Sequence, residues 1–219
     1  MARSRTLPFI IDYVDEHHDI TAEDEKSILL VLRHRERVRR IRLLMPVSSL
    51  RKLVAAIDKE FPALDHLYIG PPTKHNTILR LPKTFRAPHR RHLVLINMAS
   101  PIGCSFLMFA MDLVTLSLQL VHPSAYFPPN ILLQRLSSMP QLEVLGITFH
   151  TPLTKRAIER HLSHAPVMTH VTLPNLRWFT FRGESACLET LLPRIHAPFL
   201  EKFQVFFLDE LALSVPHLL

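Results

Sequence analysis

Four stretches of the chain share one spacing of apolar residues, written P-x-L-x-x-L-x-L, where L is any large apolar residue. They are FPALDHLYI (61–69), MPQLEVLGI (139–147), LPNLRWFTF (173–181) and APFLEKFQV (197–205). Successive side chains of a strand point to opposite faces, so the last two apolar residues of each stretch point the same way. The spacing therefore predicts four short strands that each have one apolar face.

Weaker copies of the pattern extend it along the chain. These are RVRRIRL (37–43), MDLVTLSL (111–118) and APHRRHLVL (87–95), and in the last of them Arg90 replaces the first apolar residue. The first apolar positions of all copies are 38, 64, 90, 113, 142, 176 and 200, at separations of 26, 26, 23, 29, 34 and 24 residues. Most separations lie in the range of about 20–29 residues that is typical of leucine-rich repeats. The chain is therefore predicted to consist of about seven repeats.

The segments between the copies predict the crossovers that parallel strands require. Apolar residues at helical spacing predict helices at 20–35, 48–61, 129–138, 154–164 and 184–192. We expect the first helix to begin with a capping box of Thr21 and Asp24, and the second to begin at a serine. Residues 70–88 contain several prolines and no apolar stripe, so we expect an irregular segment there, and PFIIDYV (8–14) predicts an additional strand.

Together these elements predict an α/β fold of the leucine-rich-repeat-like solenoid type. A curved parallel sheet would form the concave face, and helices and irregular segments would form the convex face, because stacked units bury a continuous core between them. Residues 1–219 would form a single degenerate domain of about seven repeats. SVPHLL (214–219) looks like the start of a repeat that is cut off.

Composition excludes several classes of protein. The chain has 219 residues with 47% apolar residues, but its 4 glycines are far apart, which excludes a phosphate-binding loop. The 2 cysteines, Cys104 and Cys187, have no CxxC partner, so we expect a reduced intracellular compartment, cytoplasmic or nuclear. The most apolar stretch, residues 105–121, is interrupted by Asp112 and Gln119 and is too short to span a membrane.

The net charge of +7 raises the possibility of a nucleic-acid partner. Much of the excess lies in RHRERVRRIR (33–42) and RAPHRRH (86–92). Nucleic-acid binding uses such basic patches together with aromatic residues. However, Val38, Ile41 and Leu43 alternate with arginine as a strand requires, so the patch is also explained by a half-buried strand. A basic-surface nucleic-acid binder remains the less favoured alternative.

Three segments resemble the leucine-rich region of fungal F-box proteins. They are DITAEDEKSILLVLRHRERVRRIRL (19–43), MPQLEVLGITFH (139–150) and MTHVTLPNLRWFTFRG (168–183), and the resemblance extends from about residue 8 to residue 219. It implies the substrate-binding part of a cullin–RING ubiquitin ligase, in which an F-box holds the Skp1 adaptor and the repeats hold the target. Leu7-Pro8 is similar to the start of an F-box but leads directly into the repeats. We therefore expect the F-box to be missing or truncated.

The candidate binding residues are those that flank the inward apolar positions and so lie on the concave face. Aromatic residues and arginine are favoured at the centres of protein interfaces. The candidate protein-binding residues are Arg40, Arg42, His66, Tyr68, His92, Trp178, Arg182 and Lys202. The simpler interpretation is that they are solvated strand residues.

Enzymatic, cofactor and metal chemistry have no motif in the chain. There is no GxSxG or HExxH sequence and no paired-carboxylate motif. His161 and His164 are three residues apart on a predicted helix but lack the third ligand that a metal site needs. We therefore predict a non-enzymatic protein-recognition module without cofactor or metal, and with an unknown protein target. The alternative within the same fold is a truncated or fragmentary repeat protein with no link to a ligase.

Overall fold

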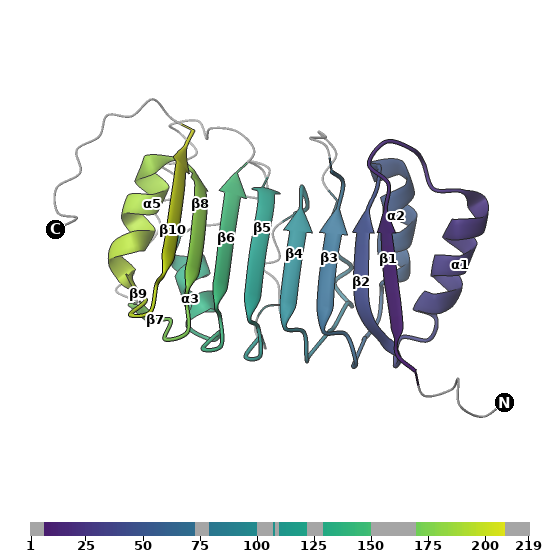
Figure 1. Cartoon of the computed structure of the whole chain (residues 1–219), viewed down its shortest axis with the longest axis horizontal. Coiled ribbons are helices and arrows are strands. Elements are labelled where there is room, and N and C mark those ends of the chain that lie inside the picture. Colours follow the sequence, from purple (N-terminus) through teal and green to yellow (C-terminus); the bar gives the residue numbers. More distant parts are fainter. Residues whose placement is uncertain are drawn as a thin grey trace.

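The computed structural model describes residues 7–72, 79–99, 107, 110–121, 129–149 and 170–208. Within them, eight strands form one sheet in which every pair of neighbours is parallel (Figure 1). In spatial order the strands are β1(Phe9–Val14), β2(Val38–Leu44), β3(His66–Gly70), β4(His92–Ile96), β5(Thr115–Val121), β6(Val144–Phe149), β8(Trp178–Gly183) and β10(Lys202–Phe207). Their order in the sheet follows their order in the chain. Each predicted strand is confirmed, including the additional strand at the N-terminal edge.

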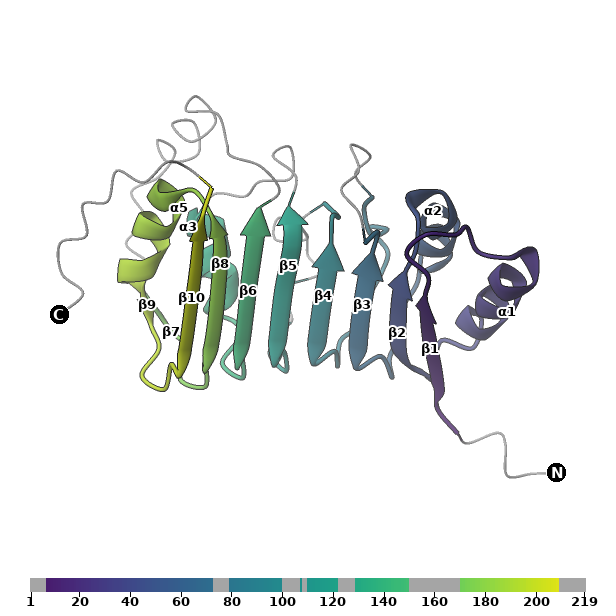
Figure 2. The same ribbon diagram turned by 45° about the horizontal axis from the view of Figure 1, so that its top comes forward.

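The described helices flank the sheet towards its two ends (Figures 1 and 2). They are α1(Ala22–Leu32), α2(Val47–Ala56), α3(Pro129–Leu136) and α5(Ser185–Leu191), and the 3-10 helix η5(Leu192–Arg194) follows α5 directly. A separate two-stranded pair, β7(Val171–Thr172) with β9(Ile195–His196), lies beside the C-terminal end of the sheet. No helix occurs among the described residues of the 70–88 segment, as its sequence predicted. The predicted α/β class with a parallel sheet is therefore confirmed.

The inward side chains of the strands form the core. One row of paired residues crosses six neighbouring strands, and all its members are at most 1% exposed: Ile41, Leu67, Leu93, Leu116, Leu145 and Phe179. These are the inward positions that the apolar spacing predicted. The pattern ends at the last strand, where Phe203 is paired with Phe179 but is 37% exposed.

The same turn precedes successive strands and accounts for five of the 18 prolines of the chain. In each case the backbone N–H at the first apolar position of the repeat, which Arg90 occupies in one copy, donates to the carbonyl three residues earlier, in the turns 61–64, 87–90, 110–113, 139–142, 173–176 and 197–200. Proline occupies the second position of all these turns except 110–113, which has Met111 there. Proline favours that position because its fixed φ matches the turn. The P-x-L part of the pattern therefore reflects the sequence preference of this turn.

A regular set of hydrogen bonds joins the starts of neighbouring strands. The carbonyl of Asp65 accepts from the N–H groups of Arg91 and His92, and the carbonyl of Arg91 accepts from Val114 and Thr115. The same arrangement recurs at the carbonyls of Val114, Glu143 and Arg177. Because the five junctions from β3 to β10 use the same backbone bonds, the register between these strands does not depend on the outward side chains.

Arg90 occupies a core position that holds an apolar residue in the other repeats. It is 2% exposed, and its Nη1 donates to the carbonyl of Ala87 at 2.6 Å. Burial lowers the pKa of this guanidinium to about 10. The turn 87–90 therefore forms around a buried arginine rather than a leucine.

Two predictions about the second helix are wrong. α2 ends at Ala56 rather than at Phe61, because Ile57 leaves the helical conformation and the N–H of Phe61 donates to the carbonyl of Arg86. Its N-cap is Pro46, which makes no side-chain capping bond. The serines near its start donate to Asp19 in the loop before α1 instead.

The capping box predicted for the first helix is confirmed in its N-cap half, whereas the Asp24 carboxylate accepts from the Thr21 hydroxyl at 2.8 Å. Thr21 is the N-cap of α1, and its hydroxyl accepts from the N–H of Asp24 at 3.1 Å. The helices expected at 129–138 and 184–192 are also present as α3 and α5. The helix expected at 154–164 and the segment 214–219 lie outside the described residues.

Candidate functional site

The face of the sheet opposite the core, called here the open face, carries two rows of paired side chains. The first row crosses all eight strands through Ile10, Arg40, His66, His92, Thr115, Val144, Trp178 and Lys202. The second row, two residues further along each strand, contains Asp12, Arg42, Tyr68, Val94, Ser117, Gly146, Thr180 and Gln204. Unlike the inward rows, neither row keeps one class of side chain across the sheet.

The predicted binding residues all lie on strands of this face. Arg40, His66 and His92 are adjacent in the first row, whereas Trp178 and Lys202 are adjacent to each other further along it. The second row contains Arg42 and Tyr68 as neighbours. Arg182 is exposed near the end of β8 and pairs with Thr148 and Phe206. The structure thus separates the candidates into two groups. The basic group lies on β2 to β4 and consists of Arg40, Arg42, His66 and His92 together with Tyr68. The aromatic group lies on β8 and β10 and consists of Trp178 with the cations Arg182 and Lys202.

The basic group contains a stacked pair of histidines. The imidazole rings of His66 and His92 are 4.1 Å apart between centroids and inclined by 18°. Nδ1 of His66 lies 3.2 Å from a carboxylate oxygen of Asp65, and Nδ1 of His92 lies 3.1 Å from the hydroxyl of Thr115. One nitrogen of the His66 ring is therefore held by the preceding residue, and one nitrogen of the His92 ring is held by a residue of the next strand. These contacts fix the orientation of both rings on the open face.

The surroundings favour the neutral form of both histidines. Partial burial lowers the pKa of His66 below its ordinary value of 6.5, and Arg40 and Arg91 lower it further, whereas Asp65 opposes the change. Burial also lowers the pKa of His92, followed by the charge of His66. Protonation of one ring therefore disfavours protonation of the other. The pair is largely uncharged at neutral pH.

The two arginines of the basic group differ in their partners. Arg42 lies 3.6 Å from a carboxylate oxygen of Asp12, and its guanidinium carbon is 5.6 Å from the centroid of the Tyr68 ring. Arg40 is exposed and has no carboxylate within ion-pair distance in the part of the chain that the structure describes. Arg40 therefore has its charge available to a partner.

A hollow of about 420 Å³ lies on the open face between the two groups of candidates. Tyr68 and Trp178 line it, and its lining between them includes Ser117, Gly146 and Thr180. Gly146 contributes no side chain, and a Cβ at this position would lie only 3.0 Å from the hydroxyl oxygen of Ser117. The hollow therefore exists because the middle strands carry small residues where the flanking strands carry large ones.

An irregularity in β5 shapes the same hollow. Leu120, which lines it, has a φ of 54°, and its N–H donates to the hydroxyl of Thr148 at 3.0 Å. The pairing of β5 with β6 shifts register at this point. The sequence did not predict this bulge, because its apolar spacing continues through it. Gly146 was a weak signal, since glycine within a strand often marks a close approach.

Trp178 is the most prominent apolar group of the open face. Its side chain is 50% exposed, and Nζ of Lys202 lies 5.2 Å from its ring centroid. The neighbouring residues Phe179 and Phe181 point the other way and are buried. The aromatic stretch of β8 thus divides into a core half and a surface half, as strand alternation predicts.

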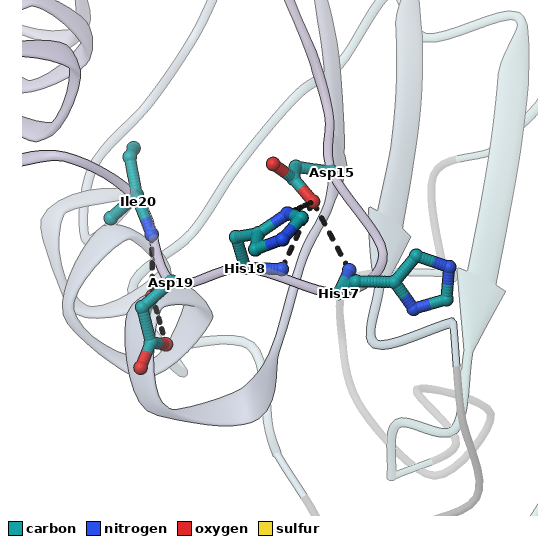
Figure 3. Close-up of polar contacts among 6 residues, drawn as sticks. Asp15, His17, His18, Asp19 and Ile20 are labelled. Carbon is teal, nitrogen blue, oxygen red and sulfur yellow. Dashed lines mark hydrogen bonds and ion pairs between the residues drawn. The ribbon is translucent and has the colours of Figure 1, made fainter.

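The acidic loop between β1 and α1 is a structural element. One carboxylate oxygen of Asp15 accepts from the backbone N–H groups of His17 and His18, at 3.1 and 3.0 Å (Figure 3). These bonds hold the pKa of Asp15 below its usual value. Asp19 likewise accepts from serine hydroxyls of α2, which lowers its pKa. The carboxylates in this loop fix its conformation.

The remaining residue groups considered in the sequence are the potential metal ligands, the cysteines and the apolar segments. They contain no group of three or more His, Cys, Asp or Glu side chains that could hold a metal ion. Cys187 is buried in α5, whereas Cys104, His161 and His164 lie outside the described residues. No described helix has the length and apolar character needed to cross a membrane.

Comparison with family models, curated proteins and solved structures produced no match for the chain. No relative therefore provides a function that could be transferred to the chain.

Proposed function

We propose that this chain is a non-enzymatic recognition module that binds another protein on the open face of its sheet. The observation that carries the proposal is the hollow between Tyr68 and Trp178, where a half-exposed tryptophan borders small residues on paired strands. An exposed aromatic side chain beside a depression is the arrangement expected of an interface anchor.

The fold we propose is a degenerate leucine-rich-repeat-like solenoid. Three features support it: the sequential parallel strands, the turn that recurs before them and the backbone bonds that recur at their starts. In a stacked array each unit contacts its neighbours, and outward side chains can vary without loss of the core. Such an array would present its outward residues as a preformed surface.

Rigidity is the physical advantage of this surface. Each outward side chain projects from a strand that is hydrogen-bonded on both sides, except at the edge strands. A partner would therefore not have to order a loop on binding, and that ordering normally reduces affinity. Sheet residues such as Thr180 and Gly146 also leave a concave site open without any conformational change.

The link to a ubiquitin ligase is a further part of the proposal and rests on the resemblance to the repeat region of fungal F-box proteins. It implies that a partner held on the open face is a ubiquitination target, and that the Skp1 adaptor joins through another segment. Co-purification of the Skp1 adaptor or a cullin with the chain would support this part. Its reproducible absence, with other partners recovered, would favour a free-standing binder.

The test of the binding surface is affinity purification with the full chain and two variants that fill the hollow, Gly146→Arg and Thr180→Arg. The control is Arg51→Glu, an equally large change at an exposed position of α2. We expect at least one partner to be lost with both filling variants and retained with the control. Urea denaturation would first establish that all variants are folded. Capture of the same partners in the same amounts by all four proteins would contradict the proposal.

A further inference from the structure

The charges of the open face point to the chemistry of the partner, given the proposed function. We infer that the partner presents a short acidic segment to the basic group on β2 to β4 and inserts an apolar side chain beside it into the hollow. The inference goes beyond protein binding in general, because it specifies the composition of the peptide that the face selects.

Charge complementarity supports the acidic segment. Arg40 is exposed and is followed in its row by His66 and His92, and Arg91 is close enough to lower the pKa of both histidines. Of the carboxylates nearby, Asp12 pairs with Arg42 and Asp65 lies against His66, which leaves Arg40 and Arg91 without an ion-pair partner among the described residues. A segment rich in Asp or Glu would therefore meet an excess of positive charge, which also steers its approach.

The hollow supports the apolar side chain. Its lining combines Trp178, Leu120 and Val144 with the small residues Ser117 and Gly146. Its volume of about 420 Å³ is enough for one large side chain. The lining also includes Glu16, whose charge opposes an acidic residue in the hollow itself. The basic group thus favours an acidic residue of the partner, and the hollow favours an apolar one.

The spacing of the strands sets the distance between the acidic segment and the apolar residue. Neighbouring strands are about 4.8 Å apart, so the row from Arg40 to His92 extends for roughly 10 Å. From His92 on β4 to Gly146 on β6 is again two strands. An extended peptide advances by about 3.3 Å per residue, so the acidic segment should begin about three to four residues from the apolar one.

A nucleic acid fits this surface less well. The arginines of β2 are separated from Arg182 and Lys202 on β8 and β10 by the uncharged residues of the middle strands, whereas a nucleic acid strand carries a phosphate at every nucleotide. The rings of Tyr68 and Trp178, on which bases would stack, each already have a cation over one face, at 5.6 and 5.2 Å. An acidic peptide needs neither a long basic track nor a free ring.

The histidine pair makes binding dependent on pH. In the unbound chain burial, and after it Arg40 and Arg91, disfavour protonation of both rings, and Asp65 is the carboxylate that opposes them. Thr115 of β5 is uncharged and contributes only a hydrogen bond. A carboxylate of the partner would raise the pKa of both histidines, so the complex binds more protons than the free chain. Affinity should therefore increase as the pH falls from about 7.5 to about 6.

The experiment is a selection from a random twelve-residue peptide display library on the immobilised full chain at about pH 6, with a twelve-nucleotide single-stranded RNA as a second probe. We expect the selected peptides to contain several Asp or Glu residues and one large apolar residue. Arg40→Glu should weaken their binding by about tenfold or more, and Arg51→Glu should leave it unchanged within about twofold. The double variant His66→Gln/His92→Gln should remove most of the pH dependence.

The possible contrary outcomes separate this inference from the proposed function. Peptides that lose binding with Gly146→Arg but have no acidic residues would overturn the acidic partner and leave protein recognition intact. Failure to enrich any peptide that depends on the open face would count against both. Binding of the RNA that Arg40→Glu abolishes, with no acidic peptides selected, would overturn the inference in favour of a nucleic acid.

Discussion

The two faces of the sheet differ in how strictly their residues repeat. The inward row from Ile41 to Phe179 contains only isoleucine, leucine and phenylalanine, and all of it is buried. The outward row one residue away runs from Arg40 through two histidines, threonine and valine to Trp178. Residues that are adjacent in the chain thus have opposite environments, one in the core and the next on the surface. The inward face is uniform because every unit packs on the same core, and the outward face varies from strand to strand.

This difference suggests a division of labour between stability and recognition. Inward substitutions remove packing that many residues share, so they should lower the free energy of unfolding. Outward substitutions leave the repeated turns and backbone bonds intact, so they should change binding with little effect on stability. The predictions below test this division, beginning with the largest expected effect.

Adjacent aromatic residues on β8 provide the sharpest contrast. Phe179→Ala should lower the free energy of unfolding by about 3–5 kcal/mol, because its ring is buried and packs 5.3 Å from Phe203. Trp178→Ala, at a half-exposed position, should lower it by about 1 kcal/mol or less. Urea denaturation followed by circular dichroism measures both. Equal losses would show that Trp178 is a core residue.

Two glycines of the sheet should respond differently to alanine. Gly70 has a φ of 156°, and a Cβ there would lie 2.1 Å from the carbonyl oxygen of Ile96, so Gly70→Ala should destabilise the chain by about 1–3 kcal/mol. Gly146→Ala meets only the Ser117 hydroxyl at 3.0 Å, which can rotate, and should change stability by about 1 kcal/mol or less. Thermal unfolding of the two variants ranks them. The reverse order would contradict the account of the hollow.

Stability should fall as the pH drops below 6.5, the ordinary pKa of histidine. Folding lowers the pKa of His66 and His92, so the unfolded chain binds more protons in this range. The loss begins near pH 6.5 and ends once the pH is below the pKa of the folded rings. The comparison is urea denaturation at several pH values for the wild type and His66→Gln/His92→Gln. Identical pH profiles would exclude the pair as the source.

The smallest effect is expected at the ion pair between Asp12 and Arg42. Both side chains are nearly half exposed, so Asp12→Asn should change the free energy of unfolding by about 0.5 kcal/mol or less. It should nevertheless strengthen the binding of an acidic peptide slightly, because Arg42 is released. Isothermal titration with a selected peptide measures this change. A weaker affinity would indicate that Asp12 itself contacts the partner.

Much of the fold could be predicted because the core repeats. The spacing within a copy, from the turn to the two inward residues, recurs along the chain, so the clear copies support the weaker ones. The end of α2 could not be predicted in this way, since Ile57 and Phe61 are buried at helical spacing although the helix has ended. Arg90 shows the same limit, because a buried arginine occupies a position where the repeat predicts an apolar residue.

The site was predictable only as a set of positions. Strand alternation placed Arg40, Tyr68 and Trp178 on the outward face, and the structure agrees. The stacking of His66 on His92 depends on the register between separate repeats, which no local pattern contains. The hollow depends on the bulge at Leu120 and on the small side chains of Ser117 and Gly146 beside it. The spacing of apolar residues contains neither feature, so it could not predict the hollow.

The central claim, that a partner binds over the hollow, can be tested directly through Trp178, the single tryptophan of the chain. Its half-exposed ring should be readily quenched by acrylamide in the free protein. A saturating amount of a selected peptide or captured partner that itself lacks tryptophan should shift the emission to shorter wavelength and reduce the quenching constant severalfold. Unchanged emission and quenching at saturation would contradict the claim.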